Sequence, residues 1–186
     1  MAVLPVRRLP DPLLKTVSRP VDRITPAIQR LIQDLIETMR HHSRCVGLAA
    51  PQVGHSMRVA VVDVTGHPKA TGPAAVGTPS PAGIVPARSP ASHGLLILVN
   101  PRITAREGLQ MQREGCLSIP DLTGNVSRSV RVQIEALDAS GHRWERWVEG
   151  FEAVAIQHEV DHLDGTLFLD RVINLRTDVF RRKRYG

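Results

Sequence analysis

The stretch QHEVDHLDG, residues 157–165, contains the pattern H-E-x-x-H. On an α-helix its two histidines, His158 and His162, lie one turn apart on the same face, because four residues separate them. Two imidazoles placed in this way can bind one metal ion, and Glu159 then reaches a water on that ion. The pattern therefore predicts a helix over residues 149–163 and a metal-dependent hydrolase built around it.

The segments around this helix have the patterns of one further helix and several short strands. A helix is predicted over residues 26–42, where Thr25 can cap, Pro26 suits the first turn and apolar residues recur at helical spacing. Short strands before a long helix favour an α+β fold, with antiparallel sheets packed around the central helix that carries the H-E-x-x-H motif. Strands are predicted at 57–64, at 95–99 with an end at Asn100-Pro101, and at 130–137 and 143–148 as a hairpin.

Composition places the chain among ordinary globular proteins. Its 186 residues fit one domain, 42% of them are hydrophobic, and no run of 18 apolar residues is long enough to cross a membrane. The net charge of +6 would suit nucleic acid, but an aromatic content of 3% argues against a base-stacking platform. We expect a cytoplasmic protein without a membrane partner or direct DNA binding. The two cysteines are too few for a disulfide framework.

Two segments depart from the general pattern of the chain. Residues 66–94 contain six prolines and five glycines with almost no apolar periodicity, which predicts a long loop inserted within the domain. Residues 171–186 form a basic C-terminal tail. The prediction for residues 1–186 is thus a single catalytic domain with an inserted loop and a basic tail.

A catalytic site of this type usually needs a third protein ligand beside an open position. No His or Glu follows His162, so the ligand is expected upstream, and Cys116 in REGCLSIP (113–120) is the best candidate. A lone cysteine is more often a small buried side chain. Glu114 and Gly115 favour the metal-binding interpretation here, because a polar neighbour and a glycine do not suit a plain core strand.

Three motifs together resemble the signature motifs of the peptide deformylases, in the same order along the chain: CVGLAAPQ (45–52), EGCLS (114–118) and QHEVDHLDG (157–165). The opening VLPVRRLPDPLLKTVSRPV (3–21) is also similar to the start of that family. The chain departs from the family pattern at Cys45, where glycine is usual, at Thr123, where a larger and often basic residue is common, and in the length of the 66–94 loop.

The resemblance implies removal of the N-formyl group from new polypeptides that begin with formyl-methionine, with release of formate. It assigns proton transfer to Glu159, and it assigns stabilisation of the oxyanion to the Gln52 side-chain amide and the Leu117 backbone N–H. The metal ligands it implies are Cys116, His158 and His162. A site with two imidazoles and one thiolate would suit Zn²⁺ by softness alone. The resemblance instead implies Fe²⁺ in the cell, with Ni²⁺ or Co²⁺ as active substitutes and Zn²⁺ as a weaker one.

Residues near the motifs are candidates for a substrate pocket. Phe151, Val154 and Ala155 share the helical face of His158 and could hold a methionine side chain, although such a stripe usually packs against a sheet. The full substrate-binding set is Val46, Gly47, Glu114, Phe151, Val154 and Ala155. Gly47 is expected to let a peptide backbone approach. Asp161 is expected either to pair with Arg128 or to stay solvated, and the histidines outside the motif, His67 and His93 among them, are expected at the surface.

The expected partners are nascent N-formylated polypeptides and, through the basic tail, the ribosome. One rival hypothesis is a zinc endopeptidase of the H-E-x-x-H type. Another is a deformylase-like protein that binds metal or ribosomes with weak or no activity, which Cys45 keeps open. The favoured interpretation of Cys45 is an ordinary backbone conformation with an inert thiol. The alternative is a thiol at the cleft wall that narrows the mouth and, when oxidised, competes with the metal for Cys116.

Overall fold

The computed structural model describes residues 2–70 and 91–182. Residues 71–90 of the predicted inserted loop and residues 183–186 of the predicted tail lie outside the described residues. The helical elements are η1 (Pro12–Lys15), α1 (Pro26–His41), η2 (Ala50–Val53), α2 (Gly150–Leu163) and α3 (Phe168–Arg171). The strands are β1 (Gly47–Ala49), β2 (Val59–Val62), β3 (Leu96–Glu107), β4 (Gln110–Cys116), β5 (Ile119–Arg128), β6 (Arg131–Leu137), β7 (Arg143–Glu149) and β8 (Val179–Arg181).

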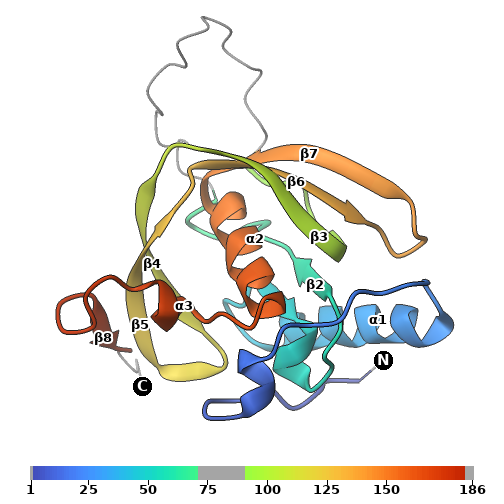
Figure 1. Cartoon of the computed structure of the whole chain (residues 1–186), viewed down its shortest axis with the longest axis horizontal. Coiled ribbons are helices and arrows are strands. Elements are labelled where there is room, and N and C mark those ends of the chain that lie inside the picture. The colour runs from blue at the N-terminus through green and yellow to red at the C-terminus, as the bar shows by residue number, and fades with distance from the viewer. Residues whose placement is uncertain (1, 71–90, 183–186) are drawn as a thin grey trace, which may run out of the picture.

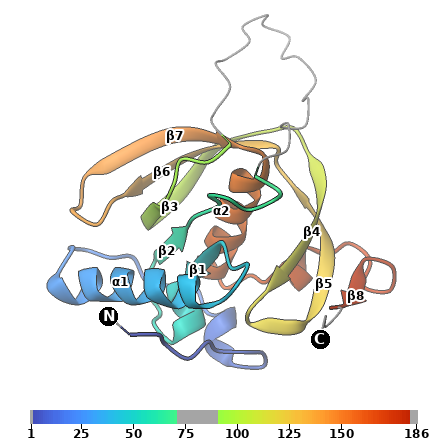
Figure 2. The ribbon, with the colours of Figure 1, turned by 180° about the vertical axis from the view of Figure 1, so that it is seen from behind.

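Two antiparallel sheets surround α2. The larger sheet has the strand order β1-β2-β3-β6-β7, and the smaller has the order β4-β5-β8. Helix α2 runs between them in Figure 1, and α1 lies beneath β1 and β2 in the reverse view of Figure 2. The predicted α+β fold with a central motif-bearing helix is therefore confirmed.

The two long helices bury different amounts of their surface. Helix α1 is amphipathic and begins as predicted, with the Thr25 hydroxyl accepting a hydrogen bond from the Ile28 N–H at 3.4 Å. Helix α2 is buried on most sides, and Ala153, Ile156 and Leu163 are fully buried. A helix that is buried almost all round is held rigidly by its neighbours, so its side chains keep fixed positions relative to both sheets.

The strand predicted to end at Asn100-Pro101 instead continues to Glu107 as β3. Asn100 takes a positive φ of 52°, and its side chain bonds both the N–H and the carbonyl of Val21 at 2.8 Å. The register against β6 shifts between Val99 and Arg102. The turn signal of Asn-Pro thus marks an irregularity within a long strand, because a bulge tolerates proline where a regular ladder does not.

The predicted basic tail is structured over its described part. Arg171 ends α3 and pairs with Asp161 at 2.6 Å, and Val179–Arg181 form β8 at the edge of the smaller sheet. Deleting residues from 179 onward would therefore remove a strand of this sheet. Among the described helices, none is long and apolar enough to cross a membrane.

Candidate metal centre

The three predicted metal ligands lie together at the centre of the molecule. Cys116 ends β4, and His158 and His162 extend from one face of α2. One ligand atom from each lies within 4.8 Å of the others, and the Cys116 Sγ is 3.2 Å from the His162 Nε2. A tetrahedral ion with ordinary bond lengths holds its ligand atoms roughly 3.5 Å apart. We refer to these three residues as the metal cluster, and their donor atoms and spacing fit a divalent ion.

The end of β4 sets the position of the thiol. The register between β4 and β5 shifts after Gly115, so Cys116 pairs with Ile119 across a tight turn. The Ser118 N–H and the Gln52 side-chain amide donate to the sulfur at 3.4 and 3.3 Å. Burial opposes a charged thiolate, but His162 and His158 together hold the pKa of Cys116 well below its ordinary value. The thiolate is the form that binds metals.

Behind His158 lies a buried chain of charged side chains. The His158 Nδ1 donates to the Glu114 carboxylate at 2.8 Å, and this carboxylate also accepts from Arg128 at 2.6 and 2.9 Å. Arg128 in turn binds Asp161 at 2.6 Å, which confirms the first of the two alternatives for Asp161. The outer end of the chain is Arg171, which donates to Asp161.

These hydrogen bonds give Glu114 a positioning role. Its two oxygens are bonded to Arg128 and His158, so the side chain fixes the orientation of an imidazole, and its predicted contact with substrate stays a prediction. Burial alone would raise its pKa, but the hydrogen bonds from Arg128 and His158 lower it to about 2. Glu114 therefore stays ionised. Because it holds the Nδ1 of His158, the Nε2 of that ring is left to face the other two members of the metal cluster.

Glu159 has the properties that a proton carrier needs. It is 3% exposed, burial raises its pKa to about 7, and its Oε2 has no hydrogen-bond partner among the described residues. Its carboxylate packs against Gly47, where an added Cβ would stand 2.8 Å from the Glu159 Cδ. The glycine of the first motif therefore makes room for this carboxylate, a purpose that the sequence prediction for Gly47 had missed.

The two predicted oxyanion donors flank Cys116. Gln52 is buried in η2, where its Oε1 accepts from the Ala49 N–H at 2.9 Å and its amide nitrogen is left facing Cys116 and Ser118. Leu117 follows Cys116 in the turn, and its side chain packs in the core beside α1. The backbone of Leu117 is thereby held next to the metal cluster.

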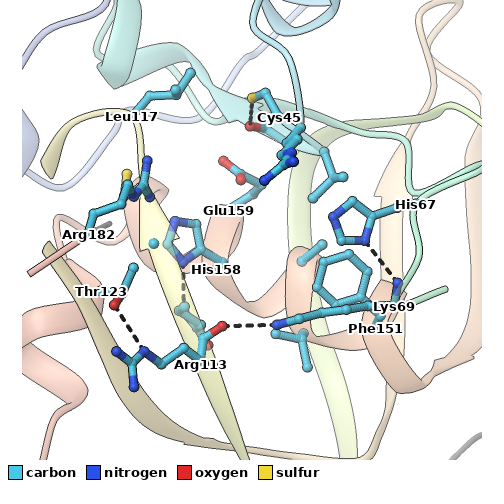
Figure 3. A pocket seen from close by; sticks show the side chains of 18 of the residues that line it. Cys45, His67, Lys69, Arg113, Leu117, Thr123, Phe151, His158, Glu159 and Arg182 are labelled. Atoms are coloured by element: carbon cyan, nitrogen blue, oxygen red, sulfur yellow. Dashed lines mark hydrogen bonds and ion pairs between the residues drawn. The ribbon is translucent and has the colours of Figure 1, made fainter. Parts of the chain in front are cut away.

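A cavity of about 590 Å³ opens from the metal cluster. All six residues of the predicted substrate-binding set line it: Val46, Gly47, Glu114, Phe151, Val154 and Ala155. The expectation that His67 lies simply at the surface is wrong, because its ring stacks on Phe151 with 4.5 Å between centroids and closes one wall (Figure 3). His93 is also half-buried, bonded at 2.6 Å to the fully buried Glu152. No spacing in the sequence connects either histidine to helix α2.

Cys45 lines the same cavity without disturbing its backbone. Among the described residues other than glycine, only Arg44 and Asn100 have positive φ, so the position of Cys45 does not require glycine. Its thiol donates to the Gly47 carbonyl at 3.1 Å. Burial, and after it the charge of the nearby Glu159, raise the pKa of this thiol to about 12. The thiol is therefore protonated at neutral pH, in line with the favoured interpretation.

The sequence and the fold of this chain are both similar to those of known peptide deformylases. The family model described as polypeptide deformylase matches residues 3–178. A peptide deformylase of Alkalilimnicola ehrlichii is 42% identical over 98% of this chain and 89% of its own length. Among solved structures, a peptide deformylase from Legionella pneumophila has a TM-score of 0.76 at 34% identity, covering 94% of this chain and 89% of its own. A Met-Ala-Ser-bound class I type b peptide deformylase from Acinetobacter baumannii has a TM-score of 0.73 at 33% identity, covering 92% and 99%.

Proposed function

The chain belongs to the polypeptide deformylase family, whose members remove the N-formyl group from new polypeptides in a metal-dependent reaction, and we propose that Cys116, His158 and His162 hold its metal ion. A divalent ion bound there supplies a Lewis acid that polarises the formyl oxygen and makes water more acidic. The remaining steps fall to side chains and backbone groups of this chain.

Glu159 is the proton carrier in this proposal. Its carboxylate takes a proton from the attacking water and delivers it to the amine that leaves with the peptide, while the formyl carbon departs as formate. A pKa near 7 allows the same group to accept and to release a proton at neutral pH. The observation that carries the assignment is the unpartnered Oε2 of this buried carboxylate, which lines one cavity together with Cys116 and His158.

The oxyanion that forms on the formyl group needs hydrogen-bond donors fixed before the reaction. We assign this role to the Gln52 amide nitrogen and the Leu117 backbone N–H. Gln52 is supported by its second contact, because the Ala49 N–H holds its carbonyl end and so fixes which end faces the cavity. The first side chain of the peptide enters the apolar part of the cavity, between Val46 and the face of α2 formed by Val154 and Ala155.

We make further proposals on the identity of the metal, the partners and the cellular location. We propose Fe²⁺ as the ion in the cell, with Zn²⁺, Ni²⁺ or Co²⁺ in purified protein; the thiolate in the cluster supports a borderline-soft ion over Mg²⁺ or Ca²⁺. We propose one catalytic domain in the cytoplasm, acting on nascent chains. Exposed arginines near the C-terminus support contact with ribosomal RNA, and Arg176→Glu should then reduce co-sedimentation with ribosomes at low salt more than Arg30→Glu on α1.

The proposed function is tested by offering two peptides to anaerobically purified protein of measured metal content. A formyl-Met peptide should yield formate and the free amine, whereas its unformylated counterpart should remain intact. Cleavage between residues of the unformylated peptide would favour the endopeptidase hypothesis. Metal-loaded protein that releases no formate would favour a binding protein without deformylase activity.

A further inference from the structure

Positive charge gathers where the cavity meets solvent. Five cationic side chains line the cavity and are exposed, and they come from four separate segments of the chain. We call this set the cationic rim: Arg44, Lys69, Arg113, Arg181 and Arg182.

The cationic rim has no counter-charge among the described residues. None of its five members forms an ion pair within residues 2–70 and 91–182, and the acids that line the cavity there are Glu114 and Glu159. Glu114 is already committed to Arg128 and His158, and Glu159 is buried beside the metal cluster. The lowered pKa of His67 agrees with this, because burial and then the charges of Lys69 and Arg44 lower it.

Arg182 reaches the cavity because β8 joins the smaller sheet. Its backbone N–H donates to the Asp121 carbonyl at 2.8 Å, which continues the pairing of β8 with β5. Its guanidinium then lies over Gly115, so close that a Cβ added to that glycine would collide with the Nη2. Gly115 directly precedes Cys116, so a C-terminal cation is placed beside the strand that carries a metal ligand.

Arg113 and Lys69 are fixed as well. The Arg113 guanidinium lies 3.4 Å from the Phe180 ring centroid, and its Nε donates to the Thr123 hydroxyl at 3.0 Å. Lys69 donates to the Arg113 carbonyl at 3.1 Å. In Figure 3, Arg182 and Arg113 lie on one side of the cavity and His67 and Phe151 on the other, with His158 and Glu159 between them. Two of the five rim side chains, those of Arg113 and Lys69, are therefore held in place by neighbours.

We infer that the cationic rim selects formylated peptides that carry a carboxylate side chain at the second to fourth residue. The inference rests on the proposed function, which places the formyl group at the metal cluster and the first side chain in the apolar pocket. An extended peptide advances about 3.3 Å per residue, so the next three residues span roughly 10 Å outward toward the exposed rim. A carboxylate there supplies the negative charge that the rim lacks.

The expected preference is moderate, because exposed ion pairs are individually weak and compete with water. Several cations around one carboxylate should give about a five- to tenfold advantage at low salt. Salt should reduce that advantage, since exposed charges are largely screened at about 0.5 M ionic strength. The effect should act mainly on KM, because the rim contacts the bound peptide away from the reacting bond.

The test compares amidated peptides formyl-Met-Ala-X-Ser in which X is Glu, Gln or Lys, so that no terminal carboxylate confuses the result. For the holoenzyme, kcat/KM should fall in the order Glu, Gln, Lys, and the differences should shrink at high salt. Arg182→Gln should weaken this order and Arg182→Glu should invert it. Arg30→Glu, which makes the same charge change on α1 far from the cavity, should leave the order intact. Arg113→Gln provides a second rim variant, with the substitution outside β8, and it should also weaken this order.

The outcomes separate the inference from the proposed function. Formate release from the Gln peptide supports the deformylase reaction by itself. Equal kcat/KM for the three peptides would overturn the rim inference while leaving the reaction in place. An equal gain for all three peptides in Arg182→Gln would also overturn it, because Arg182 would then act as an obstruction. Absence of formate from every peptide would overturn both.

Discussion

The metal cluster and the cationic rim lie in one cavity but are built in different ways. In the cluster, Cys116 and His162 are buried and His158 is half-buried. Each of the three has a hydrogen-bonded neighbour, and Glu114, Arg128 and Asp161 form a chain of contacts behind His158. The rim is exposed. Arg113 stacks on a ring and Lys69 bonds a backbone carbonyl. Chemistry common to a whole family calls for the first kind of construction. Selection among substrates needs only the second, in which single charges can change without loss of the fold.

The largest effect should follow from removing a ligand of the metal cluster. Cys116→Ala deletes the thiolate, so the protein should lose stoichiometric metal and formate release should fall by roughly 10³-fold or more. Metal analysis by mass spectrometry, together with the formyl-peptide assay, checks both. Full metal occupancy in this variant would show that the ion binds elsewhere.

A smaller but still large effect is expected at Gly47. A Cβ there would displace the Glu159 carboxylate, because it would stand 2.8 Å from Cδ and 2.9 Å from Cγ. A misplacement of about 1 Å can cost roughly 10²-fold in turnover, so Gly47→Ala should lose about that factor in kcat. Metal content should stay normal. If kcat were unchanged, the contact between these two residues would have no catalytic importance.

Glu114→Gln tests the buried support of the cluster. Loss of a group that orients a metal-bound histidine typically costs about 10–100-fold in metal affinity or activity. The folded-state pKa of Glu114 is about 2, below its ordinary value of 4.5, so the ionised side chain stabilises the fold above pH 4.5. This contribution is lost as the pH falls from about 4.5 toward 2.

The stability part of that prediction can be measured by urea unfolding of metal-free protein at a series of pH values. Between pH 4.5 and 2 the free energy of unfolding should decline less steeply in Glu114→Gln than in the parent protein. Glu37→Gln, which changes an exposed carboxylate on α1, serves as the control. Parallel curves for Glu114→Gln and the parent would contradict the assigned ionisation.

The smallest effect is expected at Cys45, on the cavity wall between the two regions. Its backbone does not require glycine and its thiol is protonated, so Cys45→Gly should change kcat/KM by less than about tenfold, or ~1.4 kcal/mol. Steady-state kinetics with a formyl-Met peptide measures this. A much larger gain would identify this chain as a weakened deformylase.

Sequence reasoning succeeded where the chemistry is encoded by spacing within one element. Four residues separate His158 and His162, so the two side chains lie on the same face of any helix. The motif around Cys116 supplied the third member of the cluster. The central helix and the β6–β7 hairpin were predicted closely for the same reason, since periodicity of 3.6 or 2 is a local property.

The features that were missed depend on contacts between distant segments. Nothing near Gly47 in the sequence indicates that Glu159 occupies the space beside it, and nothing near His67 indicates a stack on Phe151. The sequence prediction for Glu114 did not include its pairing with Arg128 for the same reason. Arg182 belongs to the segment predicted as a basic C-terminal tail, and the pairing of β8 with β5 brings it to the cavity.

The central claim is that Glu159 transfers the proton while the metal cluster alone holds the ion. Glu159→Gln keeps the shape of the side chain but removes its basicity, so one preparation should be analysed for both metal content and formate release from a formyl-Met peptide. The account predicts metal content near that of the parent protein and turnover lower by roughly 10²-fold or more. Loss of the metal, or turnover close to that of the parent, would contradict it.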